Sequence, residues 1–363
     1  IAAFCAPTRT ALRDTVSGAL LLVTFLGEAR KVTSRRAPPG EFDFRRLIKT
    51  ALFLLGLGAV LTVNSANSQP YPSKPIRILT SAPGNSDDLA ARLISQGISG
   101  GLGQQAVVDN RGVVAVEIAA KAPPDGYTLL ISSTGPMVIN PALNLKMPYD
   151  TVKDFAPVTL VVVQPLCLVV HPALPVKSVK ELIALAKEKP GQLNFSSSGI
   201  GSGTHYAGEL FVLAAGVKAA HIPYRGTPEA INDVISGRIQ FMAAPVLPAM
   251  ALVKSGRLLP LAVTSSTRLK ALPGVPTWIE AGVMDAPLTA WYSFLAPKGT
   301  PKSVIDKINR DLQTVIDMPD MREKELALGY RFIGGPPSKL AEFLPQQIAK
   351  WEKLAKSGSL LAK

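Results

Sequence analysis

The chain has 363 residues, of which 47% are hydrophobic, 18% are charged and 6% are aromatic. Its length suggests two domains, and this balance argues against a disordered chain and against a base-stacking surface for nucleic acid. The formal net charge of +13 comes without a run of Lys and Arg that could follow a phosphate backbone. We therefore expect no nucleic-acid partner, and either steering of anionic ligands or a plain basic surface.

The N-terminal region contains the pattern of an export signal. A basic stretch ending at Lys49 precedes the apolar run 51–63, and small polar residues follow it. This order predicts a secretory signal peptide over residues 45–68, with cleavage after Ser68 and a periplasmic mature protein. An uncleaved membrane anchor is the alternative. Residues 1–44 are expected to be an N-terminal extension without function.

From residue 76 onward, stretches typical of strands and helices alternate, which predicts an α/β fold. The expected strands are 76–80, 105–109, 127–131, 155–163, 166–170, 193–196, 220–223, 239–242, 259–264 and 291–297. The expected helices are 89–99, 116–122, 178–188, 206–215, 228–236, 248–255, 302–314, 318–328 and 337–354, with a further helix starting at Asn140.

The predicted elements form two similar units. Crossovers near 165–172 and 287–297 predict two lobes joined by two strands, each lobe a sheet flanked by helices. The first lobe is expected to comprise residues 69–168 and 290–363, and the second residues 169–289. Open α/β sheets bind ligands at the C-terminal ends of their strands, so we expect a ligand in the cleft between the lobes.

Three of the predicted strands run into turns rich in Gly, Ser and Asn, and each turn opens a helix. These strands end at Thr80, Ile131 and Ser196. A helix start offers unpaired backbone N–H groups and a partial positive charge, so each turn can hold an anion without a charged side chain. The pattern predicts a protein that grips a small anion.

The sequence contains no recognisable catalytic or metal-binding set. Cys167 lies in an apolar run and is expected to be a buried thiol rather than a nucleophile. The three histidines, His171, His205 and His221, lack metal-ligand spacing, so no metal is expected. The turn at Gly199 resembles a dinucleotide loop but lacks the acidic residue that would bind ribose, so no cofactor is expected.

Two residues near the turns have two possible roles each. Asp88 either caps the helix that it begins or meets an amine or hydroxyl of a ligand. His205 either packs on the preceding turn or donates a hydrogen bond to a ligand.

A series of short motifs runs through residues 70–360. It comprises residues 71–77, Pro83-Gly84 with Asp88 and Arg92, 102–104, 109–111, 124–130, Asn140-Pro141, 148–150, 154–158, Pro190-Gly191, 198–202 with His205, 209–211, 221–226, 261–265, 275–277, 280–282 and 296–301. In this order and spacing, the motifs resemble the substrate-binding proteins of tripartite tricarboxylate transporters, the Bug receptor family.

The resemblance implies a two-lobed periplasmic binding protein fold, type II-like, without enzymatic activity. Such a protein closes on a small carboxylate, which could be a di- or tricarboxylate, an aromatic acid or an amino acid. It delivers this ligand to the permease subunits of a tripartite membrane transporter, and we expect it to act as a monomer. The alternatives are a periplasmic ligand sensor that docks a signalling receptor and, less favoured, a periplasmic hydrolase.

The resemblance also implies which residues bind the ligand. By matching position they are Ala82, Pro83, Gly84, Asn85 and Asp88 in the first turn, Ser132, Ser133 and Thr134 with Asn140 in the second, Ser198, Gly199, Gly201, Ser202, Gly203, Thr204 and His205 in the second lobe, and Pro245 in the wall.

The chain departs from the family pattern at three places. Asn85 stands where the family usually has a second glycine, and Asn is expected to tolerate the positive φ of that turn. The segment 112–115 is shorter than the loop of the family. Ala243 and Ala244 replace residues that are often Phe and Asp, which removes a polar contact.

Overall fold

The computed structural model describes residues 71–143, 145–328 and 330–356. The predicted signal peptide, its cleavage site and the N-terminal extension lie outside these residues. Contacts group these described residues into one compact unit. Among the described residues, no helix combines the length and apolar character needed to cross a membrane.

The first sheet is mixed. Its strands are β1 (Ile76–Thr80), β2 (Ala106–Asn110), β3 (Thr128–Ser133), β4 (Phe155–Val170), β9 (Thr289–Pro297) and β10 (Arg331–Phe332). β1 pairs in parallel with β2 and β3, while β9 runs antiparallel between β3 and β4. The parallel pairing brings the C-terminal ends of β1 and β3 to one edge, where two of the predicted anion-binding turns begin.

The second sheet continues from the far end of β4. Its other strands are β5 (Leu193–Ser197), β6 (Ala219–Pro223), β7 (Phe241–Pro245) and β8 (Leu259–Val263). β5 pairs in parallel with β6 and β7, and β4 pairs antiparallel with β7 and β8. The C-terminal ends of β5, β6 and β7 therefore also lie at one edge.

β4 joins the two sheets. It pairs with β9 as far as Pro165, with β7 from Leu166 onward and with β8 from Cys167 onward. The sequence predicted two separate strands here, whereas the structure has one strand of 16 residues. A second connection crosses at the same level, because Thr264 N–H donates to the Leu166 carbonyl and Leu288 N–H to the Thr264 carbonyl, both at 2.9 Å.

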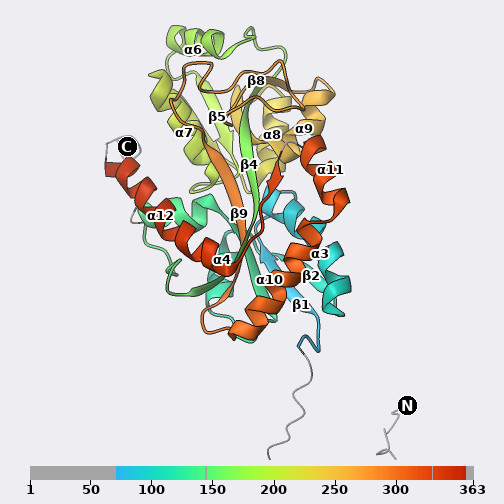
Figure 1. Ribbon diagram of the computed structural model, residues 1–363. Helices are drawn as coiled ribbons and strands as arrows, with labels where there is room; N and C mark the ends of the chain where they lie inside the picture. The colour runs from blue at the N-terminus through green and yellow to red at the C-terminus, as the bar shows by residue number, and fades with distance from the viewer. Residues whose placement is uncertain (1–70, 144, 329, 357–363) are drawn as a thin grey trace, which may run out of the picture. The chain divides into compact units, whose positions relative to one another are not determined.

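Helices cover both sheets (Figure 1). Around the first sheet lie α3 (Ser86–Leu102), η1 (Gly112–Val114), α4 (Ala115–Ala120), η2 (Gly135–Ile139), α5 (Asn140–Ala142), α10 (Lys302–Ile316), α11 (Pro319–Leu328) and α12 (Pro337–Lys356). Around the second lie α6 (Val179–Glu188), α7 (Gly203–Ala215), α8 (Thr227–Ile235) and α9 (Val246–Lys254). The architecture is a two-lobed α/β fold, as the sequence predicted.

Helix packing follows the apolar spacing of the sequence. In α10 the buried residues Ile305, Ile308, Leu312 and Val315 recur every three or four positions, which gives one apolar face. This face lies against α3 at Gly97, where an added Cβ atom would stand 2.7 Å from Val315 Cγ1. The glycine therefore allows α3 and α10 to approach closely.

Candidate functional site

A cavity of about 510 Å³ lies where the ends of β1, β3, β5 and β7 meet. Residues of both sheets and of the helices that follow them form its wall. Of the residues predicted to bind ligand, those lining it are Ala82, Asn85, Ser132, Ser133, Thr134, Asn140, Ser198, Gly199, Gly201, Ser202, Gly203, Thr204 and Pro245. The predicted residues that do not line it are Pro83, Gly84, Asp88 and His205.

Of the helices with nine or more residues, α3, α7, α8 and α9 begin at the cavity. Their first residues or N-caps line its wall. Ser202 caps α7 by accepting from His205 N–H at 3.2 Å, whereas the N-cap residues Asn85 of α3 and Gly226 of α8 make no side-chain bond to their own helix. The positive ends of the helix dipoles therefore converge on one space, which favours an anionic occupant.

Two cations stand at the same wall. Arg225 and Lys146 both line the cavity and are exposed. Within the part of the chain that the structure describes, neither the Arg225 guanidinium nor the Lys146 ammonium has a hydrogen-bond or ion-pair partner. Both charges are thus available to an anionic ligand.

Asp87 is the acidic group of the cavity wall. Its side chain is buried, and its carboxylate accepts from Ser81 N–H at 3.2 Å and from Ser81 Oγ at 2.7 Å. Burial raises the pKa of Asp87 above its usual range, and the hydrogen bonds from Ser81 offset only part of that effect. A carboxylate at this place opposes anion binding unless it is protonated or faces a donor group.

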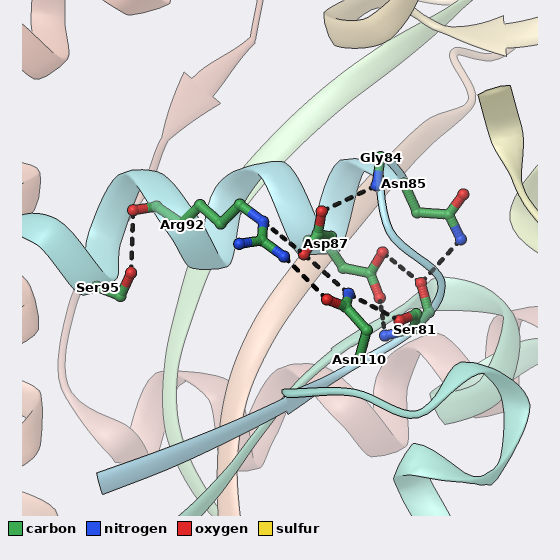
Figure 2. A network of polar contacts seen from close by, with 8 residues as sticks. Ser81, Gly84, Asn85, Asp87, Arg92, Ser95 and Asn110 are labelled. Atoms are coloured by element: carbon green, nitrogen blue, oxygen red, sulfur yellow. Dashed lines mark hydrogen bonds and ion pairs between the residues drawn. The ribbon is translucent and has the colours of Figure 1, made fainter. Parts of the chain in front are cut away.

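Asp88 holds the first turn from behind. Its carboxylate accepts from Gly84 N–H at 2.9 Å, from Arg92 Nε at 3.0 Å and from Asn110 Nδ2 at 2.8 Å. Burial alone would raise the pKa of Asp88, but these hydrogen bonds outweigh it and hold the pKa below its usual range. Figure 2 shows the network to which Gly84, Arg92 and Asn110 belong. This arrangement favours the structural reading of Asp88 over contact with a ligand.

The backbone of the first turn differs from the expectation at Asn85. Gly84 has the positive φ, at 77°, whereas Asn85 is extended with φ −69° and ψ 161°. The expected left-handed conformation of Asn85 is therefore wrong, because the preceding glycine already makes the reversal. A Cβ atom at Gly84 would also stand 2.7 Å from Pro228 Cγ.

Hydroxyl groups hold the turn of the second lobe. Thr204 Oγ1 accepts from Ser198 N–H at 2.9 Å and lies 3.0 Å from the hydroxyls of both Ser198 and Ser202. Ser202 Oγ also donates to the Gly199 carbonyl at 2.7 Å. The turn contacts the first lobe at Gly135, where an added Cβ would collide with the Gly201 carbonyl oxygen. Its shape thus depends on neutral groups.

A cluster behind this turn was missed by reasoning from spacing. The rings of His205 and His221 stack at 4.0 Å, and His205 Nε2 lies 3.7 Å from Glu209 Oε1, one helical turn later. The three side chains lie close enough to hold a metal ion. However, Gly201 N–H donates to His205 Nδ1 at 3.3 Å, which assigns the ring proton to Nε2, facing Glu209.

The same cluster supports the cavity wall. His221 Nε2 lies 2.7 Å from Ser197 Oγ, and burial lowers the pKa of His205. Both imidazoles therefore bond to the turn rather than to the cavity itself. This placement favours the packing role of His205 over donation to a ligand.

Several cavity residues had not been predicted. They include Ser81, Ser86, Asp87, Val113, Lys146, Arg225, Thr227 and Tyr292. Arg225 and Thr227 belong to a further strand–turn–helix unit, whose turn is not rich in Gly, Ser and Asn and was therefore not predicted to bind an anion. Pro228 at the start of its helix was the signal that could have found it.

The family model "Tripartite tricarboxylate transporter family receptor" matches residues 90–360. Three solved structures are similar to this chain. Rpa4515 of R. palustris, with adipate, is 32% identical, has a TM-score of 0.76 and matches over 79% of this chain and 97% of its own. The periplasmic binding protein BugD is 31% identical, with a TM-score of 0.74 and coverage of 79% and 98%. MatC of Rhodopseudomonas palustris, with bound malate, is 27% identical, with a TM-score of 0.74 and coverage of 78% and 99%.

Proposed function

Because the chain belongs to the family of tripartite tricarboxylate transporter receptors, we propose that it binds a small carboxylate between its lobes and delivers it to a membrane permease of that transporter type. Membership of this receptor family places the protein in the periplasm. The signal peptide over residues 45–68 and a monomeric state stay predictions.

One observation carries the proposal: the starts of α3, α7 and α8 meet at one cavity that also has two cations, Arg225 and Lys146, whose charged groups have no partner among the residues that the structure describes. Backbone N–H groups bind a carboxylate oxygen with defined geometry and need no counter-charge of their own. The solved relatives named with adipate and malate support the same ligand class. No catalytic role is assigned to any cavity residue.

In this mechanism the ligand carboxylate bridges the two lobes. Ser132 and Ser133 at the end of β3 face it from the first lobe, and the start of α7 at Gly203 and Thr204 faces it from the second. Contacts made from both sides at once stabilise the closed form over the open one. The two crossing segments near Leu166 and Thr264 supply the hinge, so we place the lobe boundary at these residues.

A thermal-shift titration of the purified chain tests the proposal. Adipate, malate, benzoate and glutamate are compared with uncharged amides of the same acids. A ligand that binds only the folded state raises the unfolding midpoint by an amount that grows with its concentration over Kd. We expect stabilisation by at least one acid and not by its amide.

Two matched variants test whether the acid binds in the cavity. Ser133→Ala removes a hydroxyl from the cavity wall, and we expect it to weaken binding of the active acid roughly tenfold, since hydrogen bonds to charged groups contribute about 1.5–3 kcal/mol. Ser266→Ala removes an exposed hydroxyl outside the cavity and should leave Kd unchanged. Equal binding of acids and amides would contradict a carboxylate site.

A further inference from the structure

Asn85 connects the two lobes directly. Its carboxamide oxygen Oδ1, which belongs to the first turn, accepts from the backbone N–H of Thr227 at 2.7 Å. Thr227 is the first residue of α8 in the second lobe, and its side chain is buried. Both residues also line the cavity. The bond therefore spans the cleft.

This bond caps a helix of the opposite lobe. The first N–H groups of a helix have no partner within it, and Asn is among the residues that best supply one. The N-cap of α8 is Gly226, which has no side chain to do so. Asn85, in turn, makes no side-chain bond to its own helix α3. The cap that α8 lacks comes from Asn85 across the cleft.

The orientation of the Asn85 amide is fixed from the first lobe. Its Nδ2 donates to Ser81 Oγ at 2.8 Å, and Ser81 Oγ itself donates to Asp87 Oδ1 at 2.7 Å. Because the Ser81 hydroxyl proton is used by Asp87, only the NH₂ end of the amide can face Ser81. Figure 2 shows the Asn85 nitrogen directed toward Ser81 and its oxygen directed away.

The two backbones approach closely around this bond. A Cβ atom built on Gly226 would stand 3.2 Å from Asn85 Oδ1 and 3.3 Å from Ala82 Cβ. One built on Gly84 would stand 2.7 Å from Pro228 Cγ. Glycine on both sides allows the contact, and these spacings leave no room for a ligand atom at the Asn85 bond.

We propose that Asn85 is a specificity-determining residue: its neutral oxygen occupies the start of α8, withdraws that helix from ligand binding and bonds the two lobes to each other. The ligand carboxylate is then confined to the starts of α3 and α7 and to Ser132 and Ser133. The part of this proposal that concerns ligand binding rests on the proposed function, whereas the capping of α8 by Asn85 does not.

Hydrogen exchange of the ligand-free full chain tests the cap. The Thr227 amide has no acceptor within α8, so its protection reports the bond to Asn85. We expect slow exchange in the wild type and exchange faster by roughly fivefold or more in Asn85→Ala, the size expected for one hydrogen bond. Ser81→Ala, which frees the amide to rotate, should have a smaller effect in the same direction.

Asn232→Ala is the matched control, because it removes an exposed carboxamide from the same helix outside the cavity. It should leave the Thr227 amide protected. An unprotected Thr227 amide in the wild type, or equal protection in Asn85→Ala, would overturn the cap.

Calorimetry tests the specificity. Succinate is compared with tricarballylate, which has one more carboxymethyl group. Asn85→Ala frees the Thr227 N–H for the additional carboxylate of tricarballylate. We therefore expect the ratio of the Kd for succinate to the Kd for tricarballylate to rise by roughly fivefold or more in the variant. An unchanged ratio of the two Kd values would overturn the proposal that Asn85 determines ligand specificity. If no acid binds to either protein, the proposed function and the specificity both fail, while the exchange of Thr227 still decides the cap.

Discussion

The two glycine-containing turns on either side of the cavity are held in shape by different chemistry. In the first turn, the carboxylate of Asp88 binds Gly84 N–H and pairs with Arg92. In the second, the hydroxyl of Thr204 joins Ser198 and Ser202. The first turn therefore depends on an ionised carboxylate, whereas the second depends on hydroxyls and on the imidazoles of His205 and His221 behind them. Two turns with the same strand–turn–helix arrangement can thus respond differently to pH on the two sides of one cleft.

The largest expected effect concerns close packing behind the second turn. An added Cβ at Gly208 of α7 would collide with the ring of Phe195, which is fully buried in β5. Gly208→Ala should lower the free energy of unfolding by roughly 1–3 kcal/mol, the usual cost of overpacking, as measured by urea denaturation. Gly100→Ala in α3 is the control, because its Cβ meets no atom within 4 Å. It should be neutral or slightly stabilising.

The next effect separates the two turns by pH. Asp88→Asn should lower the free energy of unfolding at pH 7 by about 2 kcal/mol, since it weakens charge-assisted hydrogen bonds. The pKa of Asp88 is lower in the folded than in the unfolded chain. Its stabilisation is thus present above the unfolded pKa and is lost as pH falls through the folded pKa. Urea denaturation from pH 7 to pH 3 should show the variant and wild type converging, and a constant difference would contradict this.

The corresponding change in the second turn should not depend on pH. Thr204→Val keeps the shape of the side chain and removes the oxygen that joins Ser198 and Ser202. We expect a loss of about 1 kcal/mol in the free energy of unfolding, because these hydrogen bonds are neutral. The loss should be equal at pH 7.5 and pH 9, where the imidazoles that also bond to this turn do not change charge, and a loss that varied over this range would show that another ionised group holds the turn.

The smallest effect concerns the acid in the cavity. Burial raises the pKa of Asp87 in the folded chain, so its contribution to stability is present below the unfolded pKa and is lost as pH rises through the folded pKa. Asp87→Asn removes this titration. We expect the free energy of unfolding of the variant, relative to wild type, to rise from pH 4 to pH 7. A difference that falls over this range would contradict the raised pKa.

Much of the site was predictable from local sequence. Apolar runs followed by Gly, Ser and Asn, such as the one after Thr80, mark strands that end in helix starts, because these preferences act over a few residues. Parallel pairing then brings such ends to one edge. The merged strand β4 was not predictable, since Pro165 interrupts the pattern and only pairing with β9 and β7 carries the strand through.

By itself, the sequence determined the α/β fold and the order of the strand–turn–helix units, and it predicted anion binding at their turns, since backbone N–H groups and helix dipoles are local properties. Only the tertiary structure decided which of two adjacent carboxylates faces the cavity, with Asp87 in the wall and Asp88 behind it. It also decided that Asn85 bonds to Thr227, 142 residues away. Such contacts depend on how two lobes approach each other, and no local pattern encodes that approach.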